Sequence, residues 1–299
     1  MSDIPTLDMR AAHAGRAMNG PPLFSRWASQ LVKFYLRCGP VDRGKWWLRQ
    51  RVSKWLVARL ETGPWIRVSG VADFEWKTLL GADNAESATS MCFRNLLQPG
   101  QTVVDVGANV GYYSLTAASR VGSSGRVIAF EPGPPAAARL LENVALNGFP
   151  NIEIVQSAVA DRTGSVAFSL GNDSEGSSMF DISGNSVQRY VDVPVTTLDG
   201  YLSTTATKHV DLLKIDAEGA ELGVVMGARN LLADPDSPAL IIEANPVTLS
   251  AAGTSVGELR DELNSLGYAI SVLESISWMG TTVENWLGTK SIDQRIGTE

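Results

Sequence analysis

Apolar residues recur every three or four positions in two stretches near the N-terminus, residues 23–38 and 44–61, a spacing typical of helices. An extended piece begins at residue 65, and a further helix is expected over residues 85–97. Beyond it, short apolar runs alternate with amphipathic stretches, which predicts strands alternating with helices. The predicted strands are residues 102–107, 126–131, 151–159, 210–216, 238–244, 268–274 and 283–287.

Between the third and fourth of these strands the pattern changes to short antiparallel strands around a loop rich in Gly, Ser and Asn. The other strand–helix units predict an α/β fold, with one mostly parallel sheet covered by helices and this β-rich insertion. Ligands bind such sheets at the carboxyl ends of the strands. Residues with chemical roles are therefore expected at those ends.

Composition is compatible with one large α/β domain and additions, because 44% of the 299 residues are hydrophobic and 19% are charged. No apolar run is long enough to span a bilayer, and the N-terminus lacks the order of a signal peptide. Cys38 and Cys92 are too few for a disulfide framework. These features favour a cytoplasmic enzyme.

Charge divides the chain unevenly. Residues 1–60 hold eight Arg and three Lys against three Asp, a net charge of +8, whereas the whole chain carries −7 and the remainder therefore −15. We expect a mobile N-terminus over residues 1–22, a basic, Trp-rich helical segment over 23–83, and the main domain over 84–299.

Two interpretations of the basic segment remain open. In the first, the segment forms a helical cap on the main domain. In the second, residues 23–61 contact either an anionic membrane surface, at the inner face of the cell membrane, or a lipid-linked acceptor. Nucleic acid is the poorest partner, because the rest of the protein is acidic.

The first chemical signal is VVDVGANVGYYS, residues 103–114, where a strand ends near Asp105 and a helix follows. Its G-x-x-x-G spacing differs from the G-x-G-x-x-G of dinucleotide folds, and an acid at the strand end would repel a diphosphate. A cationic ligand such as S-adenosylmethionine fits better. The predicted cofactor contacts in this motif are Asp105, Gly107, Asn109 and Gly111.

Two further motifs follow the next two strands. In FEPGPP, Glu131 is placed to accept the ribose hydroxyls of an adenosine, and Pro132 adjoins it. In QSAVAD, the small Ser157 and Ala158 would let an adenine lie flat, and Asp161 would accept from its amino group. Each acid has an alternative role as a helix cap or turn residue.

Four stretches, DVGANVGYYS, AFEPGPPAAARLLENVALNG, VTTLDGYL and LLKIDAEGAELGVVMGA, together resemble the FkbM family of S-adenosylmethionine-dependent methyltransferases. The resemblance covers about residues 84–245 and implies a class I methyltransferase (Rossmann-like) fold, with seven strands of which the last is antiparallel. It also implies methyl transfer, most often to oxygen on sugars, glycolipids or natural products. In the family a Glu precedes the helix before the first strand. Here that residue is Glu86, near the methionine end of the cofactor, with Thr89 nearby.

Methyl transfer to a hydroxyl requires a base for the proton, or a metal that lowers the hydroxyl pKa. Histidine does not fit, because His209 lies at the far end of its strand and His13 is in the N-terminal segment. Carboxylates at strand ends are therefore the candidates. Asp216 ends the strand next to the first one, and Glu243 ends the strand after that.

We expect Asp216 and Glu243, with Glu218, to form either a Mg²⁺ or Mn²⁺ site or a general-base site. Asp216 would also lie near the cofactor, unless it only caps the following helix. Glu221 fits helix electrostatics. Lys214 is a buried ion-pair partner or a proton-handling catalytic group, and pairing is favoured because an unpaired buried Lys is costly.

The sequence thus predicts an O-methyltransferase acting on a carbohydrate or glycolipid hydroxyl. One alternative is an O- or N-methyltransferase of a polyketide or peptide product. Another is a non-catalytic cofactor-binding scaffold, and a dehydrogenase is disfavoured by the spacing of the first motif.

Overall fold

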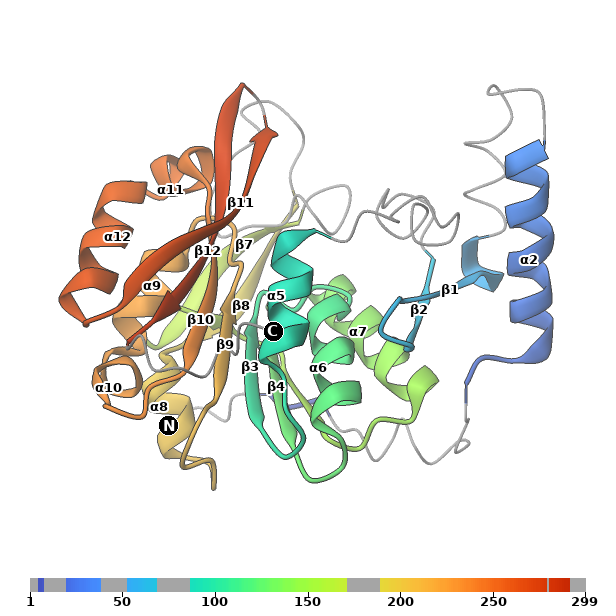
Figure 1. Cartoon of the computed structure of the whole chain (residues 1–299), viewed down its shortest axis with the longest axis horizontal. Coiled ribbons are helices and arrows are strands. Elements are labelled where there is room, and N and C mark those ends of the chain that lie inside the picture. Colours follow the sequence, from blue (N-terminus) through green and yellow to red (C-terminus); the bar gives the residue numbers. More distant parts are fainter. Residues whose placement is uncertain are drawn as a thin grey trace, which may run out of the picture.

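The computed structural model describes residues 5–7, 20–38, 53–68, 87–170, 189–278 and 280–290. Within these residues a seven-stranded sheet has the order β11-β12-β10-β9-β3-β4-β5, and β12 alone runs antiparallel to the others (Figure 1). Its strands are β3 (Thr102–Val106), β4 (Arg126–Phe130), β5 (Ile152–Val155), β9 (Leu212–Ile215), β10 (Ala239–Ala244), β11 (Ala269–Trp278) and β12 (Thr281–Thr289). The predicted fold class, including the antiparallel last strand, is confirmed.

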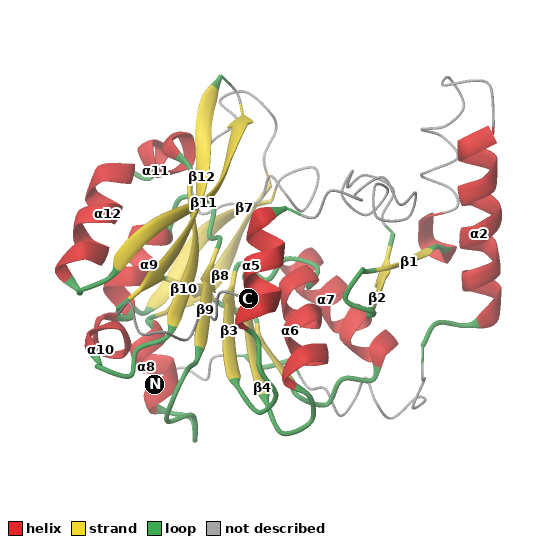
Figure 2. Ribbon diagram, viewed as in Figure 1, coloured by secondary structure: helices red, strands yellow, loops and turns green. Residues whose placement is uncertain are grey.

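The central strands are buried on both faces, which explains their nearly continuous apolar sequences. Because side chains alternate across a strand, Val103 and Leu212 join one hydrophobic cluster while Val104 and Leu213 join the other. Figure 2 shows the two layers of helices that cover these clusters. One layer holds α5 (Ala88–Leu96), α6 (Tyr112–Val121) and α7 (Pro134–Asn147); the other holds α8 (Leu198–Ser203), α9 (Glu221–Gly227), α10 (Arg229–Ala233), α11 (Pro246–Ala251) and α12 (Val256–Ser265).

The predicted third strand, residues 151–159, is in fact two strands in two sheets. Its first part is β5, and its end is β6 (Ala158–Val159), which belongs to a three-stranded sheet of order β6-β8-β7. The other members are β7 (Gly164–Leu170) and β8 (Arg189–Thr196), which pair antiparallel as predicted for the insertion. The loop between them, residues 171–188, lies outside the described residues.

The N-terminal segment is only partly helical. The helix expected over residues 23–38 is present as α2 (Leu23–Cys38), and the strand expected from residue 65 is β2 (Trp65–Arg67). The helix expected over residues 44–61 is wrong where the chain is described, because residues 53–61 form the 3₁₀ turn η2 (Ser53–Trp55) and strand β1 (Val57–Arg59). Residues 56, 58 and 60 face one hydrophobic cluster, so pairing with β2 and a two-residue period override the helical spacing.

Two asparagines of α7 hold β2 against the main domain. The side chain of Asn147 accepts a hydrogen bond from the Trp65 amide and donates one to the Trp65 carbonyl, both at 2.7 Å. Asn143 accepts from the Arg67 amide at 2.9 Å and donates to the Val110 carbonyl at 2.8 Å. Val110 belongs to the VVDVGANVGYYS motif, so Asn143 ties the N-terminal segment to that loop.

Residues 5–7, part of the segment expected to be mobile, pair with the edge of the main sheet instead. Thr6 forms an antiparallel bridge with Val155, and the Gln156 amide donates to the Pro5 carbonyl at 3.1 Å. The expected boundary between residues 83 and 84 lies outside the described residues, so the domain limits stay a prediction.

Among the described residues, no helix combines the length and the apolar character needed to cross a membrane.

Asn143→Ala should lower the free energy of unfolding by about 1–3 kcal/mol, because the Arg67 amide and the Val110 carbonyl lose a buried partner. Urea unfolding followed by circular dichroism measures the change. The matched control is Asn95→Ala on the exposed side of α5, where the change should stay within about 0.5 kcal/mol. Equal effects at both positions would show that the contact with β2 contributes nothing.

Candidate active site

The carboxyl ends of three neighbouring strands bring the predicted acids together. Asp105 of β3 pairs in register with Lys214 of β9, and Ile215 of β9 pairs with Ile242 of β10. The next residues along β9 and β10 are Asp216 and Glu243, which therefore project from adjacent strand ends as the sequence predicted.

Gly107 lies directly against the backbone of Asp216. A Cβ atom built on Gly107 would overlap the Asp216 carbonyl oxygen, and its φ of +79° is in the left-handed region. The Gly107 amide donates to the Phe130 carbonyl at 3.0 Å, and the Asp216 amide donates to the Val106 carbonyl at 3.0 Å. The two motifs, DVGANVG and KIDAEGAE, thus form one tightly packed backbone crossing.

Lys214 is the buried cation of this site. Its Nζ lies 3.2 Å from Asp216 Oδ2 and 3.5 Å from Asp105 Oδ1, and it sits 4.6 Å from the ring centre of Tyr113. Burial lowers the pKa of Lys214, but the carboxylates of Asp216 and Asp105 outweigh that effect and raise the pKa above its ordinary value. The amine therefore stays protonated, which agrees with the ion-pair interpretation.

Asp105 lies behind Lys214 rather than at an accessible surface. Its side chain is fully buried, and its Oδ2 accepts a 2.6 Å hydrogen bond from the Ser114 hydroxyl. Asp105 was predicted as a cofactor contact. In the structure the Asp105 carboxylate pairs with Lys214. Any effect of Asp105 on a ligand would therefore act through Lys214.

Glu131 and Asn109 form a polar cradle at the end of β4. Glu131 accepts from the Asn109 amide at 2.7 Å and from the Gly133 amide at 2.8 Å. Burial raises the pKa of Glu131 to about 7, against those two amides, which lower it. Asn109 has a φ of +50°, and its buried Oδ1 has no hydrogen-bond partner among the described residues. A strained residue with an orphaned acceptor beside a buried carboxylate fits the hydroxyls and amines of S-adenosylmethionine.

The turn between β9 and α9 is built around Glu221. Its buried carboxylate accepts from the Ala217 amide at 2.9 Å and from the Gly219 amide at 3.0 Å. Burial raises the pKa of Glu221 to about 7. Helix α9 begins at Glu221, because these bonds hold residues 217–220 in a turn in which Glu218 has a φ of +49°. Glu221 thus shapes the turn, which is more than the helix electrostatics expected of it.

Glu243 holds a proton at neutral pH. Burial, together with the negative charges of Asp216, Glu218 and Glu221, raises its pKa to about 9, although Lys214 lowers it. Among the described residues, no group of three or more His, Cys, Asp or Glu side chains is arranged to hold a metal ion. The structure therefore gives no support for a Mg²⁺ or Mn²⁺ site at Asp216, Glu243 and Glu218, and that site stays a prediction.

The residues predicted to contact adenine occupy different surroundings. Ser157 is fully buried, and its hydroxyl donates to the carbonyls of Ala158 and Pro194. Ala158 belongs to β6, whereas the exposed Asp161 lies 3.3 Å from Arg162 in a surface ion pair. The role of Asp161 at the adenine stays a prediction.

The remaining predicted cofactor residues flank the crossing. Gly111 caps α6 with a φ of +103°, and Pro132 lies half-buried beside Glu131. Thr89 is buried on α5, and its hydroxyl donates to Glu274 Oε2 at 3.0 Å. Glu86 lies outside the described residues.

Sequence reasoning missed two residues near this site. The ring of Tyr113 covers Lys214. The Tyr-Tyr pair at residues 112–113 directly follows Gly111 of the first motif, and that position could have indicated its role. Glu274 contacts Thr89 from β11, next to an irregularity in the register with β12 between Val272 and Glu274. Bulges of this kind re-aim side chains and are not visible in an apolar pattern. His209 pairs with Asp211 at 3.2 Å at the amino end of β9, so its exclusion as a base holds.

The strand order and this constellation define a class I methyltransferase, with a buried acid after β4 and acids at the ends of β9 and β10. The Methyltransferase FkbM domain family matches residues 105–270, which is more than half of the chain. The chain belongs to this family of S-adenosylmethionine-dependent methyltransferases, as the four motifs indicated.

Individual relatives are distant. The 2-O-methyltransferase NoeI of Sinorhizobium fredii is 26% identical over 151 residues, which cover 46% of this chain and 61% of NoeI. The AMB antimetabolite synthetase AmbE of Pseudomonas aeruginosa is 26% identical over 224 residues, or 62% of this chain and 10% of AmbE. The chain thus spans less than two thirds of the length of these relatives. A solved structure, precorrin-6y C5,15-methyltransferase of Geobacter metallireducens, is 14% identical with a TM-score of 0.42, over 67% of this chain and 87% of that one.

Gly107→Ala should abolish binding of S-adenosylhomocysteine in calorimetry, because the new methyl group would displace the Asp216 carbonyl. Gly253→Ala is the matched control. Gly253 has the same φ of +79°, but no atom lies within 4 Å of its Cβ position, so it measures backbone strain alone at about 1–3 kcal/mol. Similar loss of binding in both variants would contradict the role of the crossing.

Affinity for S-adenosylhomocysteine should fall as the pH drops through about 7, the raised pKa of Glu131, because only its ionised form accepts from both ribose hydroxyls. Affinity should be full above that range, where Glu131 is charged. Calorimetry at several pH values measures this affinity. Glu131→Gln should weaken binding about tenfold to a hundredfold and flatten this pH dependence. An unchanged slope in Glu131→Gln would assign the titration to another group.

Proposed function

We propose that this chain transfers the methyl group of S-adenosylmethionine to a hydroxyl oxygen of a carbohydrate or glycolipid acceptor. The observation that carries the proposal is the pair of carboxyls at adjacent strand ends, Asp216 above the buried Lys214 and Glu243 with its proton retained. The likeness to a protein named 2-O-methyltransferase supports transfer to oxygen.

In this proposal the chain binds the cofactor, orients the acceptor and takes up the hydroxyl proton. S-adenosylmethionine supplies an electrophilic methyl group on a sulfonium and leaves as S-adenosylhomocysteine. Glu131 and Asn109 hold the ribose, and Lys214 fixes the direction of the Asp216 carboxylate. Glu243, which is protonated, donates a hydrogen bond that orients the acceptor. As the new O–C bond forms and the S–C bond breaks, the hydroxyl proton passes to Asp216.

Asp216 is open enough for this role. Its side chain is 37% exposed, whereas that of Lys214 is only 6% exposed, so an acceptor would meet the carboxylate before the amine. We assign Lys214 a positioning role, because an ammonium held by two carboxylates at 3.2 and 3.5 Å is a poor proton acceptor.

A second candidate is O- or N-methylation of a polyketide or peptide product, which the likeness to a protein named antimetabolite synthetase supports. An acceptor panel with radiolabelled methyl donor separates the two, because mass spectrometry of the product identifies the methylated atom. A non-catalytic scaffold would bind the cofactor without turnover over the whole panel.

Asp216→Asn should lower kcat about 10²–10⁴-fold, the usual contribution of a proton acceptor, with a smaller effect on S-adenosylhomocysteine affinity. Glu243→Gln keeps a donor and should lower kcat much less, while the matched control Asp192→Asn, exposed on β8, should leave activity unchanged. Steady-state assays after EDTA treatment complete the test, and activity should persist. Full activity of Asp216→Asn, or a loss on EDTA that Mg²⁺ restores, would overturn the assignment of Asp216 as proton acceptor.

A further inference from the structure

Helix α2 presents four large apolar residues to solvent, while Ala28 and Val32 pack against the core. Leu23, Phe24, Trp27 and Leu31 are 80%, 58%, 61% and 48% exposed. The opposite side of the helix, against β1, carries small residues. There the Ser29 hydroxyl accepts from the Val57 amide at 2.9 Å. A surface helix normally turns its large apolar side inward, so this arrangement is inverted.

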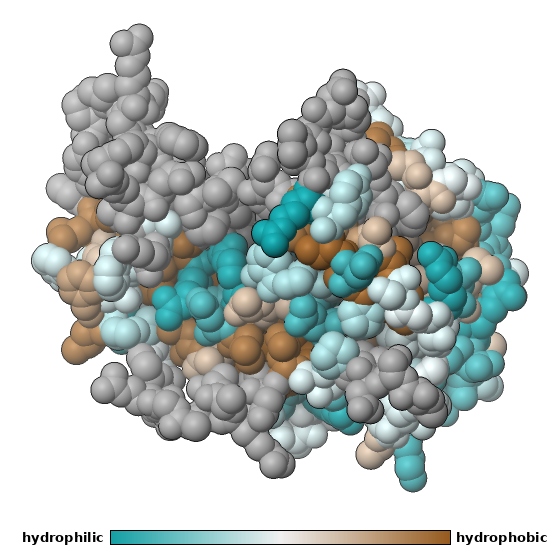
Figure 3. Space-filling view, turned by 180° about the vertical axis from the view of Figure 1, so that it is seen from behind, coloured by the Kyte–Doolittle hydropathy of each residue, from teal (hydrophilic) through white to brown (hydrophobic). Residues whose placement is uncertain are grey.

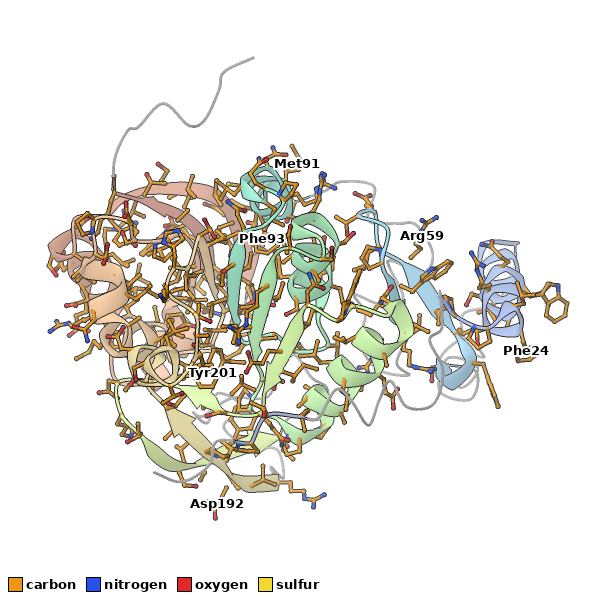
Figure 4. All side chains as sticks on the ribbon, turned by 90° about the horizontal axis from the view of Figure 1, so that it is seen from below. Phe24, Arg59, Met91, Phe93, Asp192 and Tyr201 are labelled. Carbon is orange, nitrogen blue, oxygen red and sulfur yellow. The ribbon has the colours of Figure 1, made fainter. Side chains whose placement is uncertain are left out.

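The exposed residues form one continuous surface with the neighbouring 3₁₀ turn. Phe24 lies 6.4 Å from Trp27 and 6.1 Å from Trp55 between ring centres, and Trp55 is 50% exposed. We call Leu23, Phe24, Trp27, Leu31 and Trp55 the aromatic face. Figure 3 shows hydrophobic side chains at the edge of the molecule formed by α2, and Figure 4 shows Phe24 at the end far from Asp192 and Tyr201.

The charge around this face is positive. The sequence of α2 contains Arg26, Lys33 and Arg37 and no acid. Residues 20–60 hold nine Arg or Lys against the single acid Asp42, whereas residues 61–299 carry −15. A symmetric contact between two copies through this face would place two strongly basic segments against each other, which is unfavourable. An anionic surface complements the charge instead.

We propose that the aromatic face docks the protein peripherally on an anionic phospholipid bilayer. Trp, Phe and Leu on one side of a helix insert at the boundary of headgroups and acyl chains, and nearby Arg and Lys bind the anionic headgroups. Arg26 and Arg59 lie 5.0 and 5.7 Å from the Trp65 ring centre, beside the face. The acidic remainder of the chain is repelled by the same surface, so the protein is held with α2 toward the lipid.

This inference is tested by flotation of the full chain with vesicles of phosphatidylcholine alone and with about 30% phosphatidylglycerol. Binding should require phosphatidylglycerol and weaken between about 0.15 M and about 1 M salt. The double variant Phe24→Ser with Trp27→Ser should weaken vesicle binding about tenfold or more. The matched control is Tyr190→Ser, which removes an aromatic ring that is 53% exposed on β8.

Calorimetry with S-adenosylhomocysteine checks that every variant retains its fold, and it keeps a failure of docking separate from a failure of the methyltransferase assignment. Unchanged flotation of the double variant, or equal binding to both kinds of vesicle, would overturn the inference. Sedimentation velocity tests whether the chain forms a dimer through this face. A dimer that the double variant dissociates would assign the face to a second copy of the chain and reject lipid docking.

Discussion

The ion pairs of Lys214 hold the candidate site together. Its ammonium group is almost fully buried between Asp105 and Asp216, so the charge of each carboxylate is compensated only while Lys214 keeps its place. Removing one partner would leave an uncompensated charge in the core, which is far costlier than losing a surface pair. The position of Asp216, the most important residue of the proposal, is therefore fixed by residues on two neighbouring strands.

The backbone enforces the same arrangement independently. Gly107 allows the Asp216 carbonyl to pass at van der Waals distance, and Glu221 binds the amides of the following turn. Side-chain charge and main-chain packing thus act on the same few residues. This dual constraint explains why one motif has a glycine at position 107 and the other, more than a hundred residues later, has an acid at position 216.

Local patterns predicted most of the strands and the acids at their ends well, because short buried strands and the residues that follow them are encoded within a few positions. Prediction failed where distant segments compete with local spacing. Residues 53–61 have helical spacing but pair with β2, and Asn143 docks that hairpin through hydrogen bonds that no periodicity reveals. The start of α9 is likewise not set by periodicity, since Glu221 binds backbone amides ahead of it. The proton affinity of Glu243 could not be predicted either, because it depends on how deeply the fold buries that carboxyl.

The acids at the strand ends also explain how the site matches its proposed cofactor. Asp216, Glu218 and Glu221 together raise the pKa of Glu243 beyond the effect of burial, and Lys214 offsets only part of their charge. Such an excess of negative charge favours a bound sulfonium. In the proposed transfer to a hydroxyl, that positive charge would disappear as the methyl group leaves the sulfur, and the hydroxyl would release a proton. The carboxyls would then lose a cation that favours their ionised form, so the proposed transfer would leave them better able to keep the proton that it supplies.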